Sequence, residues 1–224
     1  MMRAAAVVVC LLFRQDTAQD LFKKVEKKLS SAKSLSLKFK GEMSAEGEKA
    51  EISGSLRLKS GDRYVFSLNM VRGDDKRSIE ARSDGKTVVS TTDGKTSEEP
   101  VKEGVTKFLT AAISRTGFMI AFMTLSPGGK KAPIPNPDEA LKVSGFEKGA
   151  SGKIGGKDVF ELKFQVALKG MQEIRVALTV EDGTLVPRRI ETRLKQDTTE
   201  ILMVETYEDF STDEIPDAEF EPKK

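Results

Sequence analysis

The sequence predicts a mainly β protein with some α-helix, built on an antiparallel sheet of about ten strands. Three observations predict this fold class. Apolar and polar residues alternate over many short segments, Asp-Gly turns separate those segments, and helical periodicity is confined to two regions. Successive strands follow each other too closely for helical crossovers, so neighbouring strands should be antiparallel.

An amphipathic helix opens the predicted domain. In "DLFKKVEKKLSSAKS" the apolar residues Leu21, Val25 and Leu29 recur at helical spacing, and Phe22 lies beside them. Lysines fill the opposite face. This pattern predicts a helix with one side against the core.

Five strands are predicted in the first half of the chain, each with apolar residues at every second position. They cover residues 35–40, 52–58, 64–70, 79–81 and 86–92. The segments between them, such as "KSGDR", "SDGK" and "TDGK", carry Asp and Gly, which accept the positive φ of hairpin turns.

The second half repeats this pattern. The predicted strands cover residues 143–148, 160–168, 174–180, 185–195 and 199–210. The stretch "SGKIGGK" lacks the spacing of a phosphate-binding loop and is predicted to be another hairpin turn.

The central segment, residues 101–141, interrupts the strands. In "VKEGVTKFLTAAISRTG" apolar residues recur at i, i+3, i+4, i+7 and i+8, which predicts a core-facing helix that Gly117 ends or kinks. The stretch "SRTGFMIAFMTLSPGG" contains an uncharged run from Gly117 to Leu125 in a chain with 32% charged residues. The Pro- and Gly-rich stretch that follows is interpreted as an ordered surface loop or lid.

The uncharged run has three interpretations. It is far shorter than the ~20 residues of a membrane-spanning helix, which excludes an anchor. It can be a helix packed into the concave face of a curved sheet, as part of the core. It can also be the wall of a ligand cavity, because Met and Phe adapt to acyl chains, which gain ~0.8 kcal/mol per CH₂ removed from water. The last two interpretations are compatible.

The composition excludes several classes of function. There is no His and no Trp, and the single Cys is at position 10, which argues against thiolate catalysis, His-based acid–base catalysis and Cys/His metal sites. The 37 Lys and Arg nearly balance 35 Asp and Glu. Because these charges are interspersed, nucleic acid is not an expected partner.

Acidic residues are expected in turns or at outward-facing strand positions. Pairs such as Asp74-Asp75 and Asp213-Glu214 lack the spacing of a calcium loop. Two carboxylates converging on a cleft, as glycosidases need, are not expected either. We therefore predict no enzyme activity, no metal and no cofactor.

The N-terminus has the layout of a secretory signal peptide. Arg3 precedes ten apolar residues, and polar and small residues follow. We predict a signal peptide at residues 1–18, cleaved near Ala18, and one domain at residues 19–224; a buried N-terminal strand is the alternative. Thr17 and Asp20 have capping-box spacing, so the cap and a cut after Ala18 compete.

The order of elements and four motifs resemble the LolA/LolB-like family of periplasmic lipoprotein-localisation factors. The motifs are "GSLRLKSGDRYVF" at 54–66, "SDGKT" at 83–87, "TGFMIAFM" at 116–123 and "TYEDFSTDEIPDAEFEP" at 206–222. The resemblance implies a curved, incompletely closed antiparallel barrel of ten to eleven strands, with an N-terminal helix and central lid helices over an apolar cavity. Two features depart from the family: Ser60 and Gly61 stand where the carriers have an Arg-Pro pair, and there is no Trp.

The resemblance implies a monomeric periplasmic carrier or binding protein that holds acyl chains of lipoproteins or other lipids and meets protein partners in the inner or outer membrane. The alternatives are an RseB-like envelope-stress sensor or protein-interaction domain, and a purely structural domain. The inward strand positions and the lid supply the predicted apolar lining: Leu37, Phe39, Leu56, Tyr64, Phe66, Phe118, Met119, Phe122, Met123, Phe164 and Leu178.

Overall fold

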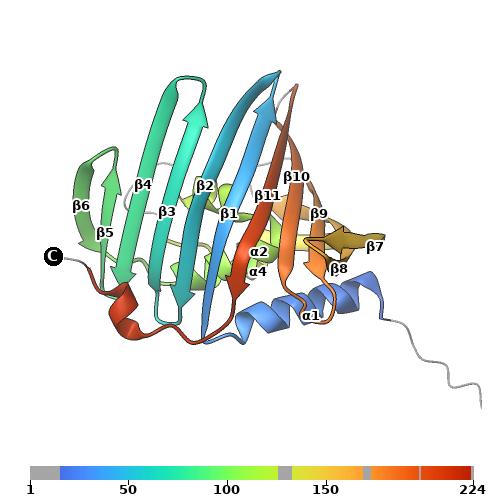
Figure 1. The fold of residues 1–224 in the computed structure, drawn as a ribbon, viewed down its shortest axis with the longest axis horizontal. Helices are drawn as coiled ribbons and strands as arrows, with labels where there is room; N and C mark the ends of the chain where they lie inside the picture. Colours follow the sequence, from blue (N-terminus) through green and yellow to red (C-terminus); the bar gives the residue numbers. More distant parts are fainter. Residues whose placement is uncertain (1–15, 126–132, 169–172, 197, 223–224) are drawn as a thin grey trace, which may run out of the picture.

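Eleven antiparallel strands form a single curved sheet in the computed structural model, which describes residues 16–125, 133–168, 173–196 and 198–222. The strand order is β6-β5-β4-β3-β2-β1-β11-β10-β9-β8-β7 (Figure 1). The strands are β1 (Ser34–Ala45), β2 (Glu48–Lys59), β3 (Arg63–Arg72), β4 (Asp75–Asp84), β5 (Thr87–Thr92), β6 (Lys95–Pro100), β7 (Leu141–Ile154), β8 (Lys157–Leu168), β9 (Ile174–Glu181), β10 (Pro187–Gln196) and β11 (Thr199–Ser211).

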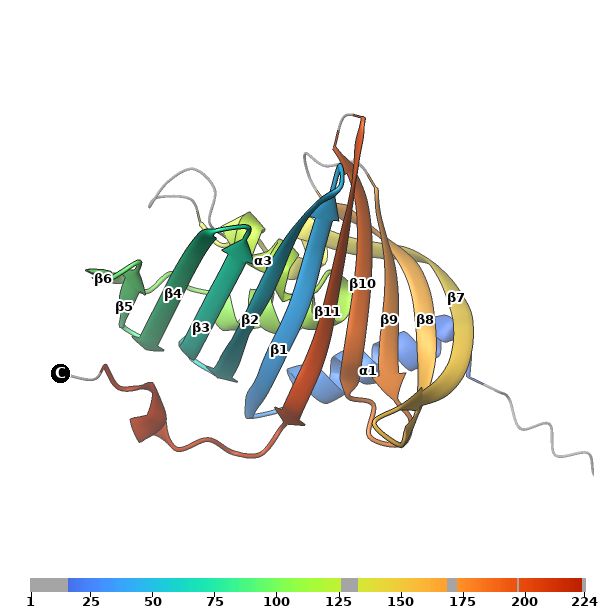
Figure 2. The ribbon, with the colours of Figure 1, turned by 45° about the horizontal axis from the view of Figure 1, so that its top comes forward.

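The sheet is a half-barrel. Its first and last strands, β1 and β11, pair at the centre, whereas β6 and β7 are its two edges. Figure 2 shows the sheet curling around the helices without closing. The predicted curved, incompletely closed antiparallel barrel is therefore confirmed.

The structure differs from the sequence prediction in one additional strand, β6, and in the bounds of several others, since β1, β2, β4 and β7 extend beyond the predicted segments. β6, with the sequence KTSEEP, was not predicted, because it has no alternating apolar residues and lies at the edge of the sheet. β7 is longer than the predicted segment 143–148, and its register against β8 shifts twice. Such shifts are typical of edge strands that bend.

The helices are α1 (Ala18–Ser30), α2 (Val105–Arg115), α3 (Phe118–Leu125) and α4 (Pro137–Ala140), and a short 3₁₀ turn covers Asp217–Phe220. They confirm the amphipathic opening helix and the helix break at Gly117. α2 and α3 lie over the concave face of the sheet (Figure 2), and α1 packs on β7 and β8 through Phe22, whose ring centroid is 5.0 Å from that of Phe146 and 4.9 Å from that of Phe164.

Thr17 and Asp20 form the capping box of α1. The Asp20 N–H donates to Thr17 Oγ1 at 3.1 Å, and the Thr17 N–H donates to Asp20 Oδ2 at 3.2 Å. A cut after Ala18 would remove this cap, which is typically worth ~1 kcal/mol. The predicted signal peptide otherwise falls mainly on residues 1–15, outside the described residues.

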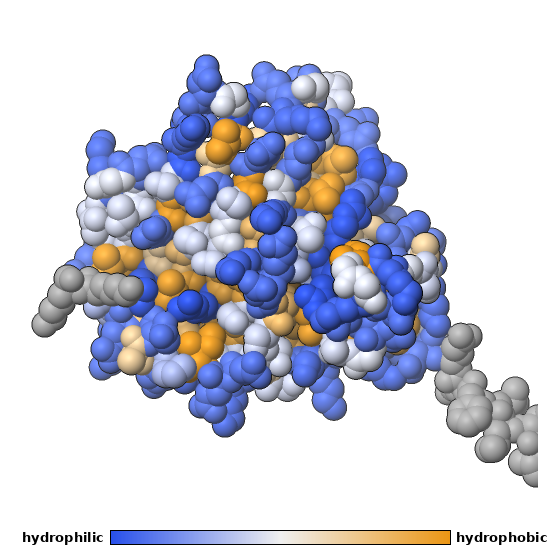
Figure 3. All heavy atoms as spheres, in the orientation of Figure 1, coloured by the Kyte–Doolittle hydropathy of each residue, from blue (hydrophilic) through white to orange (hydrophobic). Residues whose placement is uncertain are grey.

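The opposite face of the sheet is largely hydrophilic, with apolar residues scattered among the charged ones (Figure 3). The C-terminal segment, which includes the short 3₁₀ turn at Asp217–Phe220, packs against β3 and β4. Phe220 is fully buried there, and Arg57 and Lys59 pair with Glu219 and Asp217 at 2.7 and 2.6 Å.

Gly54, in the middle of β2, leaves free the space that the Phe39 side chain needs in the core. A β-carbon on Gly54 would lie 1.9 Å from the Ser67 carbonyl oxygen and 2.7 Å from Cζ of Phe39. The Phe39 ring therefore lies where a side chain on Gly54 would be, and β3 runs too close to give way.

We expect Gly54→Ala to lower the free energy of unfolding by ~1–3 kcal/mol in urea denaturation, because the methyl group overpacks this site. Gly152→Ala in β7 is the matched control, since nothing lies within 4 Å of its β-carbon position. Equal effects of the two substitutions would contradict this account of Gly54.

Candidate ligand-binding site

Four phenylalanines meet where α3 lies over the sheet, and we call them the phenylalanine cluster: Phe39, Phe66, Phe118 and Phe122. The Phe118 ring is 4.8 Å from Phe39 and 5.2 Å from Phe66, and Phe122 is 5.6 Å from Phe66, between ring centroids. These distances are those of favourable aromatic pairs. The cluster joins α3 to β1 and β3.

The structure brings together only some of the predicted lining residues. Leu37, Leu56 and Phe66 are cross-strand neighbours in β1, β2 and β3, next to the phenylalanine cluster. Phe164 belongs to a different aromatic group, with Phe22 and Phe146, and Leu178 lies on β9.

Most of these side chains are buried. Tyr64 and Phe122 are half-buried, Met123 is exposed, and the remaining predicted residues lie in the core: Leu37, Phe39, Leu56, Phe66, Phe118, Met119, Phe164 and Leu178. Their role in binding a ligand stays a prediction. In the arrangement described here they contact neighbouring core residues.

α3 is apolar on every side. Seven of its eight residues, FMIAFMTL, are apolar, and the single polar one, Thr124, donates its hydroxyl hydrogen to the Ile120 carbonyl oxygen at 2.7 Å. A helix on a protein surface ordinarily has one polar face. Here Met123 is 37% exposed, and Phe122 and Leu125 are half-buried.

A buried carboxylate holds the first turn of α3. Glu205 of β11 is 1% exposed, and it accepts hydrogen bonds from the Phe118 N–H at Oε2 and the Met119 N–H at Oε1, both at 2.8 Å. The Tyr207 hydroxyl also donates to Oε2, at 3.0 Å. These donors replace water around the carboxylate and satisfy amides that a helix start leaves unpaired.

The expectation that every acidic residue lies in a turn or faces outward was wrong for Glu205. Met203, Glu205 and Tyr207 are buried at alternate positions of β11. The sequence did indicate that Glu205 faces inward, because it lies two residues from Met203 and from Tyr207 in an alternating strand. Without the position of α3, nothing indicated that a carboxylate could be satisfied there.

Burial shifts the pKa values of Glu205 and Tyr207. It raises the pKa of the Glu205 carboxyl above its usual range, although its three hydrogen-bond donors oppose the shift. Burial and the neighbouring carboxyl group also raise the pKa of Tyr207.

Gly117 permits the close approach of Glu205 to α3. Its φ is +84°, in the left-handed region, and a β-carbon there would lie 2.6 Å from Glu205 Oε1. The preceding carbonyl, that of Thr116, accepts a hydrogen bond from Thr192 Oγ1 of β10 at 3.1 Å. The break between α2 and α3 is thus fixed to the sheet on both sides of Gly117.

A groove of about 620 Å³ lies elsewhere, between α1, α2 and the adjoining ends of β1 and β2. Its floor includes the buried Leu29, Leu35 and Leu58, and its walls are polar and charged. None of the predicted lining residues lies along it. Among the described residues, its Lys27 and Lys107 form no ion pair.

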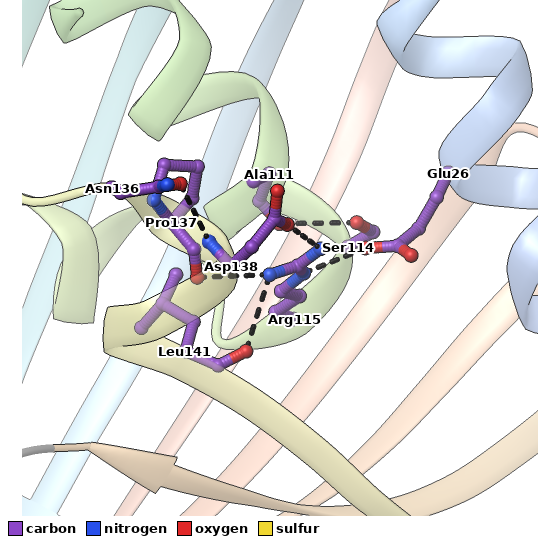
Figure 4. Close-up of polar contacts among 8 residues, drawn as sticks. All are labelled: Glu26, Ala111, Ser114, Arg115, Asn136, Pro137, Asp138 and Leu141. Carbon is purple, nitrogen blue, oxygen red and sulfur yellow. Dashed lines mark hydrogen bonds and ion pairs between the residues drawn. The ribbon is translucent and has the colours of Figure 1, made fainter.

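Arg115, at the end of α2, is one of the residues that line this groove, and Figure 4 shows its polar contacts. Its Nε donates to Glu26 of α1 at 2.6 Å, and its Nη2 donates to Asp138 of α4 at 2.9 Å. Nη1 donates to the carbonyl oxygens of Pro137 and Leu141 at 2.9 and 3.2 Å. One guanidinium group therefore joins α1, α2, α4 and β7.

The comparisons with known proteins identify the fold. No family model matches the chain, and no curated protein sequence matches it. The crystal structure of LprF from Mycobacterium bovis is similar over 86% of this chain and 92% of LprF, with a TM-score of 0.50 and 10% identity.

Two further similar structures have lower TM-scores than LprF. The LolA superfamily protein NE2245 from Nitrosomonas europaea covers 93% of this chain and 99% of its own, at 11% identity and a TM-score of 0.38. A chain of the Pseudomonas aeruginosa MucA/MucB complex covers 92% of this chain and 61% of its own, at 11% identity and a TM-score of 0.41. The likeness to LprF shows a shared fold and nothing more. The open, curved antiparallel sheet is the architecture that the resemblance of the motifs implied.

Two further findings concern the described residues only. They contain no group of three or more metal-ligating side chains suited to an ion. No helix among them has the length and apolar character needed to cross a membrane.

We expect Arg115→Ala to lower the free energy of unfolding by ~3 kcal/mol, because it leaves Glu26 and two carbonyl groups without their donor in a largely buried site. Thermal and urea denaturation measure this. Arg57→Ala is the matched control: the Arg57 side chain is 46% exposed, against 12% for Arg115. Its loss should cost less than ~1 kcal/mol. Similar losses for both variants would contradict the proposed role of Arg115.

Proposed function

We propose that this protein binds acyl chains, of lipoproteins or of other lipids, between the sheet and α3, with α3 as a movable cover. The observation that carries the proposal is the apolar character of α3 on all sides. The helix lies on an unclosed half-barrel, over Phe39 and Phe66, and leaves Phe122, Met123 and Leu125 partly exposed.

An acyl chain would have to displace α3, because the side chains beneath it contact one another. Phe118 touches both Phe39 and Phe66, so no acyl chain fits between them while α3 is in place. A bound acyl chain would then pack its own CH₂ groups against Phe39 and Phe66 in place of Phe118, each CH₂ being worth ~0.8 kcal/mol. Exchange of this kind needs no chemical step, so we propose a carrier or binding protein and no enzyme.

The proposal includes export. The signal-peptide layout of residues 1–18 supports action in the periplasm, as one domain from residue 19 onward, where acyl chains must be shielded from water during transfer. Partners in the inner or outer membrane would then deliver or accept the ligand.

Protein purified without detergent should carry lipid. We expect mass spectrometry of its organic extract to show acyl species in a stable ratio to protein. An extract without them, together with no uptake of a fluorescent fatty acid, would refute the proposal.

We expect Phe122→Asp to reduce uptake of a fluorescent fatty acid at least ~10-fold, because a charge on α3 opposes burial of an acyl chain beside it. Circular dichroism should show unchanged strand content. Val71→Asp is the control, since Val71 is an apolar residue that is 37% exposed and lies near the end of β3, outside the phenylalanine cluster. If Phe122→Asp unfolds the protein, α3 is ordinary core; if both variants lose uptake equally, binding is not located at α3.

A protein partner is the second candidate, and the groove between α1 and α2 favours it. The groove combines an apolar floor with two lysines, Lys27 and Lys107, and one glutamate, Glu103, that have no ion pair among the described residues. Such a surface suits a peptide with acidic and apolar residues more than a bare acyl chain. An empty lipid extract would favour this alternative, and charge reversal at Lys27 and Lys107 would then test it.

A further inference from the structure

Glu205 is the side chain that ties α3 to the sheet. Among the described residues, no other side chain of the sheet hydrogen-bonds to the helix; Thr192 bonds to the residue before Gly117. The remaining contacts of α3 with the sheet are apolar, and apolar contacts can be exchanged for those of a ligand. The bonds to Glu205 have no such replacement in an acyl chain.

We infer that Glu205 is the positioning residue that holds α3 closed over Phe39 and Phe66, and that the charge on its carboxyl group sets how readily α3 opens. This inference rests on the proposed function, because it assigns the control of access to the site beneath α3. It goes beyond that function because it names Glu205 as the residue, and the charge on its carboxyl group as the property, that control this access.

The surroundings of Glu205 offer it no cation among the described residues. From α3 it meets the N–H groups of Phe118 and Met119, from its own strand the Tyr207 hydroxyl, and from β1 its cross-strand neighbour is Gly41. From β10 its neighbour is Ile190. Within the part of the chain that the structure describes, Tyr207 is therefore the one titratable group that faces it, and it is neutral below its raised pKa.

Ionisation of a buried carboxyl group costs free energy when no cation lies beside it, and the N–H dipoles of the helix offset only part of that cost. Opening of α3 would admit water and return the Glu205 carboxyl to its ordinary pKa. The closed form therefore binds the proton more tightly than the open form does.

The sign of the pH dependence follows. Stabilisation of the closed form is complete below the ordinary pKa of the carboxyl and declines as pH rises toward the raised pKa of the closed form. Opening should therefore increase with pH, up to about tenfold for each pH unit within that window. Above the raised pKa of the closed form, the extent of opening should no longer change with pH.

Hydrogen exchange of the α3 amides tests this directly. After correction for intrinsic exchange, protection of residues 118–125 in the wild-type protein should fall as pH rises above the ordinary pKa of a glutamate carboxyl group. Glu205→Gln has no titrating group at this position, so its protection should not depend on pH. Glu208→Gln, at a position of the same strand that faces away from α3, should behave like the wild type.

Uptake of a fluorescent fatty acid, measured over the same pH range, separates this inference from the proposed function. A faster wild-type uptake rate at higher pH, lost in Glu205→Gln, supports both. Protection that depends on pH without any uptake supports the role of Glu205 and refutes acyl-chain binding. Equal pH dependence of protection in the wild type and Glu205→Gln overturns the inference.

If Glu205→Gln does not fold, Tyr207→Phe serves instead. It removes a donor that favours the ionised carboxylate, so the midpoint of the pH dependence should move upward. An unchanged midpoint in this variant also overturns the inference.

Discussion

The hydrogen bonds between Glu205 and the first two amides of α3 fix the position of the helix above the sheet. They place Phe118 over Phe39 and Phe66, and they require the left-handed backbone and missing side chain of Gly117. Because Gly117 also separates α2 from α3, the same contact sets where the long helical segment turns. A single carboxylate in the concave face thus determines how an apolar helix covers an open half-barrel.

Different kinds of interaction hold the two ends of the helical layer in place. Arg115 joins α1, α2, α4 and β7 through charged hydrogen bonds, whereas α3 rests on apolar contacts and a buried acid. Charged networks of the first kind are hard to displace, because every group in them would be left without its partner. Apolar contacts are exchanged readily for those of a ligand, which makes α3 the part of the layer best suited to move.

The fold was largely predictable from the sequence, because its strands are amphipathic and its turns carry Asp and Gly. The inward alternation of β1, β2 and β3 correctly grouped Leu37, Leu56 and Phe66. β6 was missed because its residues are polar at nearly every position, so that only pairing with β5 identifies it as a strand.

The site was harder to predict than the fold, because it depends on which elements meet. Alternation identified Phe164 as inward but could not show that its aromatic neighbours are Phe22 and Phe146 instead of the phenylalanine cluster. The groove between α1 and α2 joins segments far apart in the chain and has no local pattern. Glu205 follows the inward alternation of its strand, but its role depends on amides from a distant helix.

Methionine-methyl NMR would test the central claim, that α3 covers a site for acyl chains, most directly. Met119 and Met123 lie on α3, and Met43, on β1 and paired with Met203, is a reference within the same sheet. Titration with a medium-chain fatty acid should shift the Met119 and Met123 signals saturably and leave Met43 nearly unchanged. Saturable binding that leaves both α3 methionines unshifted would contradict the account.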